Sequence, residues 1–90
     1  MEQRYLEILQ KTSEALEYYK KEYGFESVAG YHIKVTPTSR EDWFERIDWL
    51  IDNGYLCMSK GMWCDMVDGY METYKVTEKG YKYLEEIENV

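Results

Sequence analysis

Four carboxylates recur at helical spacing in the middle of the chain, at Glu41, Glu45, Asp48 and Asp52. Steps of four, three and four residues place side chains on one face of an α-helix. Two carboxylates held close together could serve as a general acid and a general base. Carboxylates at this spacing more commonly form a solvated helix face, and we expect that role here.

Other reactive side chains are few. His32 is the single histidine, and neither a serine nor a cysteine motif lies beside it. Cys57, on a predicted strand, suits a small core residue better than a nucleophile. Cys64 could expose its thiol, but the neighbouring Asp65 disfavours the thiolate. A nucleophile, a base and an orienting group are not brought together by any motif. We therefore predict that the protein is not an enzyme.

No metal or cofactor site is expected from the sequence. The two cysteines are seven positions apart and form no C-x-x-C motif, so a reduced pair is predicted rather than a zinc site or a disulfide framework. Asp65 and Asp68 are too sparse for a calcium-binding EF-hand loop. The chain also lacks a glycine-rich phosphate loop.

The size and charge of the chain restrict its partners. Residues 1–90 suffice for one small domain with one modest core. The net charge of −7 favours basic protein partners and disfavours nucleic acid and anionic membranes. The N-terminal sequence MEQRYLEILQ has no continuous apolar run. We expect neither a signal peptide nor a transmembrane helix, and a soluble, cytoplasmic protein.

The first element that must position these groups is a helix predicted from about Glu2 to Tyr23 and ended by Gly24. Residues of an amphipathic stripe follow one another along it at steps of four and three: Tyr5, Leu9, Thr12, Leu16, Tyr19 and Tyr23. The stripe either packs into the core or pairs in part with the same helix of a second subunit.

The segment from Phe25 to Val35 is ambiguous. It could form a short helix through Val28, Ala29, Tyr31 and Ile33 followed by a turn, or a strand over His32 to Val35. We favour the short helix. The Thr36-Pro37 step ends any helix that precedes it.

The helix that carries the four carboxylates has the clearest boundaries. Ser39 is a suitable N-cap, Asp42 lies in the first turn, and Asn53-Gly54 ends the helix. An apolar arc on this helix is expected to face the core, and it comprises Trp43, Phe44, Ile47, Leu50 and Ile51.

A β-hairpin and a last helix should follow. Alternating apolar and polar residues predict strands from Leu56 to Lys60 and from Tyr70 to Val76, with Gly61 and Asp68-Gly69 bracketing the loop between them. Thr77 is the expected N-cap of the last helix. Its inner face is expected to carry Val76, Gly80 and Leu84, together with Tyr83 or Ile87.

Two passages resemble winged helix-turn-helix domains. The run DWFERIDWLIDNGYL, from Asp42 to Leu56, is similar to their helix, glycine, aromatic and strand passage. The run YKVTEKGYKYL, from Tyr74 to Leu84, resembles their return strand and "Leu-Thr-x-x-Gly" helix start, with Val76 where leucine is commoner. This resemblance implies an α+β winged helix with three or four helices and a β-hairpin wing in the C-terminal half. The style is similar to small prophage-encoded winged-helix proteins.

In such families the helix before the hairpin enters the major groove of DNA, and basic wing residues touch the backbone. Carried over to this chain, the groove face would consist of Glu41, Glu45, Asp48, Trp49 and Asp52. Affinity for DNA depends on neutralised phosphates, and an acidic residue reads a base only after other groups anchor the backbone. Residues 38–54 carry two basic and five acidic side chains. The charge therefore favours a protein partner.

The predicted hairpin loop adds a second indication. Met62, Trp63, Met66 and Val67 lie close together in a segment that should reach solvent. Exposed tryptophan and methionine often mark a partner surface. The alternative is that the loop folds back and buries them.

Two hypotheses follow. The first is a non-catalytic, acidic winged-helix module that binds a protein, such as a basic nucleic-acid-handling protein that a phage or mobile element regulates or inhibits. Its contact residues would be Glu41, Glu45, Asp48, Trp49, Asp52, Met62, Trp63 and Met66. The second is a DNA-binding transcription regulator that forms a homodimer through the first helix. Its phosphate contacts would be Lys34, Arg40, Arg46, Lys60 and Lys75.

Overall fold

The computed structural model describes residues 1–36, 39–65 and 68–88, and for Lys60, Gly61, Met62 and Cys64 the backbone alone. Along the chain the elements are α1 (Gln3–Tyr23), β1 (Val28–Ala29), the 3₁₀ turn η1 (Gly30–His32), α2 (Arg40–Asp52), β2 (Leu56–Cys64), β3 (Gly69–Val76) and α3 (Glu78–Glu88). The predicted α+β class is confirmed.

The three strands form an antiparallel sheet in the order β1-β3-β2. The hairpin register runs from Leu56 opposite Val76 to Cys64 opposite Gly69, with a shift between Lys60 and Met62. The strand predicted to end at Lys60 therefore continues to Cys64, and the loop is shorter than expected. A bulge explains the difference, because one extra residue can be accommodated while pairing resumes beyond it.

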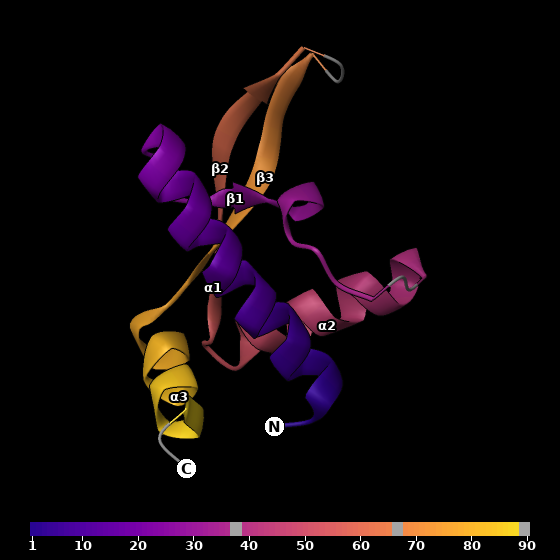
Figure 1. The fold of residues 1–90 in the computed structure, drawn as a ribbon. Helices are drawn as coiled ribbons and strands as arrows, with labels where there is room; N and C mark the ends of the chain where they lie inside the picture. The colour runs from indigo at the N-terminus through magenta and orange to yellow at the C-terminus, as the bar shows by residue number, and fades with distance from the viewer. Residues whose placement is uncertain (37–38, 66–67, 89–90) are drawn as a thin grey trace.

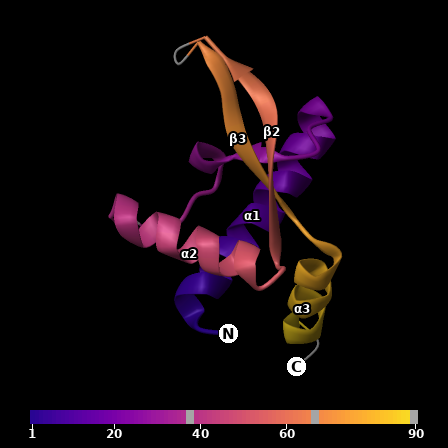
Figure 2. The ribbon, with the colours of Figure 1, turned by 180° about the vertical axis from the view of Figure 1, so that it is seen from behind.

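The hairpin tip lies at one end of the molecule, and α2 and α3 lie at the other (Figure 1). Figure 1 shows α1 running across one face of the sheet, with α2 and α3 at the end of the molecule away from the hairpin tip. Seen from behind, α2 lies in front of α1 (Figure 2). The tip of the hairpin extends beyond all three helices. The N-terminus lies at the end of the molecule away from this tip, as does α3 (Figure 1).

The core lies where α1, α2 and the base of the sheet meet. Its fully buried side chains include Ile8 and Leu9 of α1, Ile47 and Leu50 of α2, and Val28 of β1. The predicted stripe of α1 is buried only as far as Leu16, and Tyr23 is 62% exposed. The last turns of α1 thus extend past the core.

Local capping sets the predicted helix boundaries. The Ser39 hydroxyl accepts a hydrogen bond from the Asp42 N–H at 3.1 Å, which begins α2 as expected. Gly54, after the end of α2, and Gly24, after the end of α1, both have positive φ values, of 81° and 75°. These left-handed conformations favour glycine, so the two stops are confirmed.

The start of α3 also follows the prediction and requires a glycine. The Thr77 hydroxyl accepts the Gly80 N–H at 3.0 Å and donates to the Tyr55 carbonyl at 3.1 Å. A Cβ at position 80 would lie 2.5 Å from the Tyr55 carbonyl oxygen and 2.6 Å from a methyl carbon of Val76. Gly80 therefore lets α3 approach the hairpin base closely.

The segment after α1 differs from the predicted short helix. Val28 and Ala29 form a strand opposite Tyr74 and Thr73, and only Gly30–His32 make a single 3₁₀ turn. Val28 and Ala29 are fully buried, and pairing with β3 satisfies their backbone while it buries both side chains. The alternative strand over His32 to Val35 is also wrong.

The apolar arc of α2 is rotated from its predicted position. Ile47 and Leu50 are buried, but Phe44 is 40% exposed. Instead Arg46 is largely covered, because its side chain, 13% exposed, packs beside α1 and donates to the Arg4 carbonyl at 3.4 Å. Docking of α1 against this flank turns the opposite flank, with Phe44, toward solvent.

Candidate functional site

The four predicted carboxylates of α2 all face solvent, as expected. Glu41, Glu45, Asp48 and Asp52 are exposed. Glu45 differs from the other three because Arg4 of α1 reaches it, with Nη2 3.2 Å from Oε1. The outward acidic surface of α2 therefore rests mainly on Glu41, Asp48 and Asp52.

Arg46 of α2 and Arg4 of α1 form ion pairs with acidic side chains of the chain itself. Arg46 Nη2 lies 2.7 Å from Asp42 Oδ2, and Arg4 Nη1 lies 3.7 Å from the other oxygen of Asp42. Arg4 also binds Glu2 and Glu45. These pairs join the start of α1 to α2, so Arg46 is placed as a structural residue.

Trp49, predicted on the acidic face, is half-buried. Its ring stacks on Tyr5 of α1, with centroids 4.2 Å apart and planes 9° apart, and lies 6.1 Å from the ring of Tyr55. It packs against the core cluster, so its main contacts are internal. The structure thus separates Trp49 from the exposed carboxylates.

The hairpin carries exposed aromatic side chains. Trp63 is 53% and Tyr70 66% exposed, and their rings meet edge to face at 5.4 Å. The Trp63 indole N–H donates to Asp65 at 2.8 Å. Met66 and the side chain of Met62, both predicted as contacts, lie outside the described part of the chain. Trp63 is therefore the member of this predicted group whose exposure is established.

A groove that the sequence did not predict lies between α2 and the hairpin. Its volume is about 530 Å³, and it is lined by Gly30, Tyr31, Trp43, Phe44, Tyr70, Met71, Glu72 and Tyr74. Burial raises the pKa of the Tyr74 hydroxyl, and the negative charges of Glu72 and Asp48 raise it further. Carboxylates of two separate elements therefore act on the same side of the sheet.

We call the exposed carboxylates of α2, together with exposed side chains of the groove and the hairpin, the acidic–aromatic face. It comprises Glu41, Phe44, Asp48 and Asp52 of α2 with Trp63, Tyr70 and Glu72 of the hairpin. Sequence reasoning missed Tyr70 and Glu72, although Tyr70, Glu72 and Tyr74 alternate along one strand and so share a face. The predicted apolar arc of α2 included Phe44, so this exposed residue was assigned to the core.

The cations proposed for DNA binding do not gather on this face. Lys75 lines a pocket with α1 and α3, whereas Lys34 lies beside His32 and α1. The Arg40 guanidinium lies over the Phe44 ring, 5.6 Å from its centroid. The side chain of Lys60 lies outside the description, and Arg46 is paired. Lys34 and Arg40 line one pocket, together with Trp43, whereas Lys75 lies in a different pocket.

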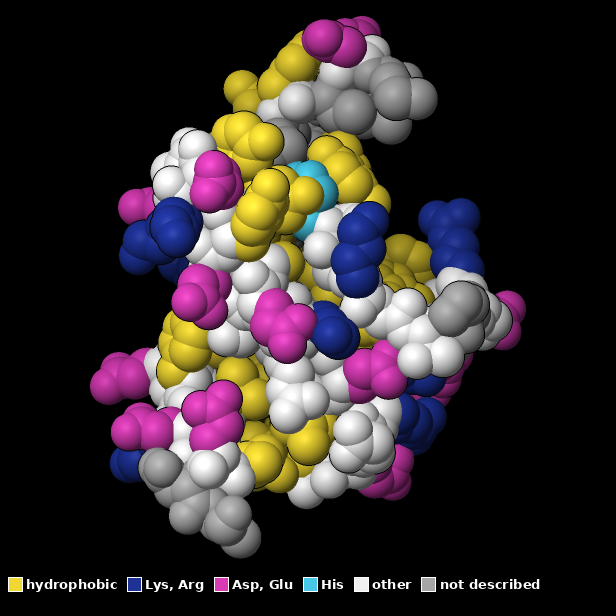
Figure 3. Space-filling model, in the orientation of Figure 1, with side chains coloured by type: hydrophobic (Ala, Val, Ile, Leu, Met, Phe, Trp, Pro, Cys, Tyr) yellow, Lys and Arg dark blue, Asp and Glu magenta, His cyan; other side chains and the backbone are white. Residues whose placement is uncertain are grey.

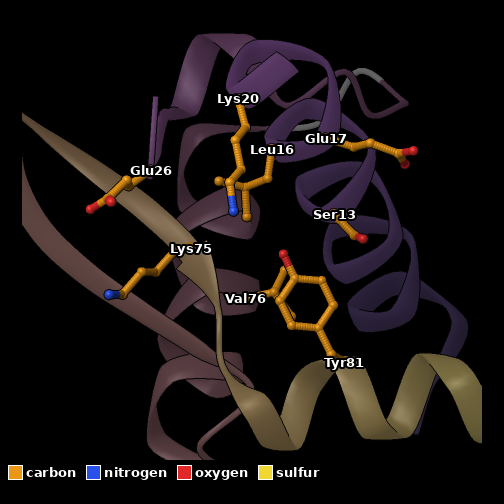
Figure 4. Close-up of a pocket in the computed structure, with 8 residues that line it drawn as sticks. All are labelled: Ser13, Leu16, Glu17, Lys20, Glu26, Lys75, Val76 and Tyr81. Carbon is orange, nitrogen blue, oxygen red and sulfur yellow. The ribbon is translucent and has the colours of Figure 1, made fainter. Parts of the chain in front are cut away.

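The pocket that contains Lys75 has mixed charge. Its volume is about 570 Å³, and it is lined by Ser13, Leu16, Glu17, Lys20, Glu26, Lys75, Val76 and Tyr81. In Figure 4 the Lys20 amine and the Tyr81 hydroxyl point toward the space between the elements, whereas the Glu17 carboxylate points away. Burial raises the pKa of Tyr81, and Glu17 raises it further. The pocket offers hydrogen-bonding groups of both signs.

His32 belongs to an aromatic cluster at the far end of α1. Its ring stacks on Tyr19 at 4.1 Å and meets Tyr31 edge to face at 4.2 Å. Burial lowers its pKa, and the charge of Lys34 lowers it further. Figure 3 shows this histidine among hydrophobic side chains near the end of α1, while charges of both signs are spread over the rest of that face.

Reactive and metal-binding groups are not assembled among the residues that the structure describes. Within residues 1–36, 39–65 and 68–88, no three histidine, cysteine or acidic side chains are placed to hold a metal ion. Cys57 is a free, half-buried thiol. The helices of the described chain also include none with the length and apolarity needed to cross a bilayer.

Comparison with protein-family models, with curated proteins and with solved structures found no match for this chain. The chemistry of the acidic–aromatic face is accordingly the basis on which its function must be inferred.

Proposed function

We propose that this chain is a non-catalytic, winged-helix-like module that binds a basic protein through its acidic–aromatic face. One observation carries the proposal. Asp48, one of the exposed carboxylates of α2, acts on Tyr74, which lines the same groove as the exposed rings of Phe44 and Tyr70. Exposed aromatic groups beside a concentrated charge are typical of a surface completed by a partner.

The arrangement of elements supports the winged-helix part of the proposal. A helix precedes a β-hairpin, a further helix follows it, and a short strand joins the sheet in the order β1-β3-β2. This order accords with the resemblance of the passages around α2 and α3. The chain departs from a four-helix version, because one 3₁₀ turn stands between β1 and α2.

Charge supports a basic partner. The net charge is −7, and long-range attraction would speed encounter with a cationic surface. DNA would meet Glu41, Asp48 and Asp52 instead of phosphate-binding groups, because Arg46 is paired and Lys75 lies in a different pocket. A basic nucleic-acid-handling protein is the partner class that fits best. Its assignment to a phage or mobile element, in the cytoplasm, rests on resemblance alone.

Affinity capture tests the proposal. The purified chain, immobilised, is used to recover partners from extracts of the cells that produce it, together with the variant Asp48→Lys/Asp52→Lys. We expect the variant to lose the partner by at least about tenfold, which corresponds to about 1.4 kcal/mol. Glu45 is left intact because it is bound to Arg4.

The matched control is Glu85→Lys/Glu86→Lys, which makes the same change of net charge at exposed positions on α3. It should recover the partner as well as the unaltered chain does. Equal recovery by all three proteins would show that the acidic side of α2 is not the contact.

The second candidate is a homodimeric DNA-binding regulator with α1 as the dimer element. The order of elements around α2 favours this candidate. The exposed rings of Tyr18 and Tyr23 near the end of α1 favour it as well. Gel shifts with duplex DNA at low salt distinguish the two candidates, because electrostatic binding is strongest there. A shift that disappears as salt rises would favour the regulator; we expect no shift.

A further inference from the structure

The groove between α2 and the hairpin combines exposed rings with one carboxylate. Tyr31, Phe44 and Tyr70 line it and are 57%, 40% and 66% exposed. Trp43 lines it as well and is half-buried. Glu72 is the one charged side chain among the described residues that line it. The groove therefore offers aromatic faces to solvent beside a negative charge without a described cation in its lining.

This combination selects a cation over a neutral apolar group. Aromatic rings attract cations through the negative potential of their faces, and a carboxylate adds a charge-assisted hydrogen bond. Asp48 contributes to the same local field, as its effect on the pKa of Tyr74 indicates. An apolar ligand would gain from the rings alone.

The chain already binds its own cations with aromatic rings. The Arg4 guanidinium lies 4.6 Å from the centroid of Tyr5, and the Lys79 amine lies 4.6 Å from that of Tyr55. At the edge of the groove Arg40 lies over Phe44 but is not among the lining residues. Phe44 is nevertheless 40% exposed and lines the groove.

We propose that this groove binds the guanidinium of an arginine side chain that a basic partner segment presents, with the rings of Tyr31, Phe44 and Tyr70 around it and Glu72 as its ion-pair partner. Arginine fits better than lysine because its planar guanidinium stacks on aromatic rings and binds a carboxylate with two parallel hydrogen bonds. This inference rests on the proposed function and names the chemistry that the partner must carry.

Titration of the ¹⁵N-labelled chain with short blocked peptides tests the inference without a known partner. The probe is acetyl-Gly-Arg-Gly-Arg-Gly-amide, compared with the same peptide carrying citrulline, which has nearly the same shape and no charge. We expect the arginine peptide to shift the amide signals of Gly30, Tyr31 and residues 70–72. The citrulline peptide should bind at least about tenfold more weakly, and the lysine peptide about threefold more weakly.

Two variants locate the contact. Glu72→Gln and Tyr70→Ser each alter an exposed side chain and should weaken arginine-peptide binding about five- to tenfold. The matched control Glu17→Gln removes a carboxylate from the pocket beside α3 and should change binding less than twofold.

A third variant tests whether Lys60 of the chain itself competes with an outside cation for Glu72. The strand register sets Lys60 opposite Glu72. If an outside cation uses the Glu72 carboxylate, Lys60→Gln should keep or strengthen binding. Weaker binding by this variant would contradict the inference, and so would equal binding of the citrulline peptide or shifts confined to α3.

The outcomes separate this inference from the proposed function. If Asp48→Lys/Asp52→Lys loses the captured partner while Glu72→Gln and Tyr70→Ser keep it, the partner uses the acidic side of α2 and the groove inference fails alone. If all these variants keep the partner, the proposed function fails as well.

Discussion

The groove beside α2 and the pocket beside α3 are similar in size, at about 530 and 570 Å³, but they differ in chemistry. Five aromatic residues line the groove together with Glu72, whereas two lysines and two glutamates line the pocket together with Tyr81 (Figure 4). Opposite charges offset one another in the pocket. The described lining of the groove contains Glu72 and no cation, so charge balance rather than volume distinguishes the two cavities as sites for a basic partner.

The largest expected effect comes from comparing Trp49, which packs against the core, with Trp63, which belongs to the acidic–aromatic face. Trp49→Ala removes a ring stacked 4.2 Å from Tyr5 and should lower the free energy of unfolding by about 2–3 kcal/mol. Trp63→Ala removes a ring that is 53% exposed and should cost less than about 1 kcal/mol. Urea denaturation of both variants provides the measurement. Equal losses would contradict this division.

The second prediction compares Gly80, where α3 approaches the hairpin base, with Gly30 in the groove. Gly80→Ala forces a Cβ to within 2.5 Å of the Tyr55 carbonyl oxygen and should destabilise the protein by about 1–3 kcal/mol, although alanine usually favours a helix. At Gly30, which lines the groove, the nearest atom would be 3.5 Å away, on Trp43. Gly30→Ala should therefore change stability by less than about 0.5 kcal/mol. Thermal unfolding measures both, and a stable Gly80→Ala variant would overturn the close approach.

The third prediction reverses one charge in each cavity, so that the groove loses its carboxylate and the pocket gains one. Glu72→Lys should weaken binding of the arginine peptide more than about tenfold, or about 1.4 kcal/mol. Lys75→Glu removes a cation from the pocket and adds a carboxylate, so weak peptide-induced shifts should appear at Ser13 and Tyr81. Amide NMR titrations of the two variants test this. If Lys75→Glu creates no new shifts, charge balance alone does not control binding.

The smallest effect concerns His32, which contacts Tyr19 of α1 and Tyr31 of the groove. Its pKa is lowered by burial and then by Lys34, so below about pH 6.5 the unfolded chain binds the proton more readily than the folded one. Stability should fall slightly as the pH drops from 7.5 through 6.5 toward the lowered pKa, and remain constant above that range as far as His32 is concerned. Melting temperatures of the unaltered chain and of His32→Gln measure this.

The variant should lose part of the pH dependence. Because His32 is the single histidine, no other imidazole contributes to this range. An unchanged slope in His32→Gln would show that its burial does not influence folding.

The helix boundaries could be predicted because each depends on adjacent residues. Ser39 caps α2 through a hydrogen bond to a residue three positions away, and Gly54 adopts the left-handed conformation that follows the helix. Thr77 and Gly80 mark the start of α3 in the same way. The outward direction of Glu41 and Asp48 follows from helical periodicity. None of these features requires knowledge of a distant segment.

The features that escaped prediction depend on distant segments. Val28 and Ala29 became a strand because Tyr74 and Thr73 offered pairing partners more than forty residues away. Phe44 became exposed because α1 covered the Arg46 flank of α2 instead. Trp49 left the acidic surface because Tyr5 supplied a stacking partner. In each case packing between elements decided between orientations that the local pattern allowed.

The amino-acid sequence by itself determined the α+β class, the caps of the helices, the hairpin and the acidic character of α2, because these depend on local conformational preference, periodicity and composition. Only the tertiary structure decided that Tyr31, Phe44 and Tyr70 meet beside Glu72 in one groove. Those residues come from η1, α2 and β3, and their proximity depends on how helix and sheet pack, which no local pattern encodes.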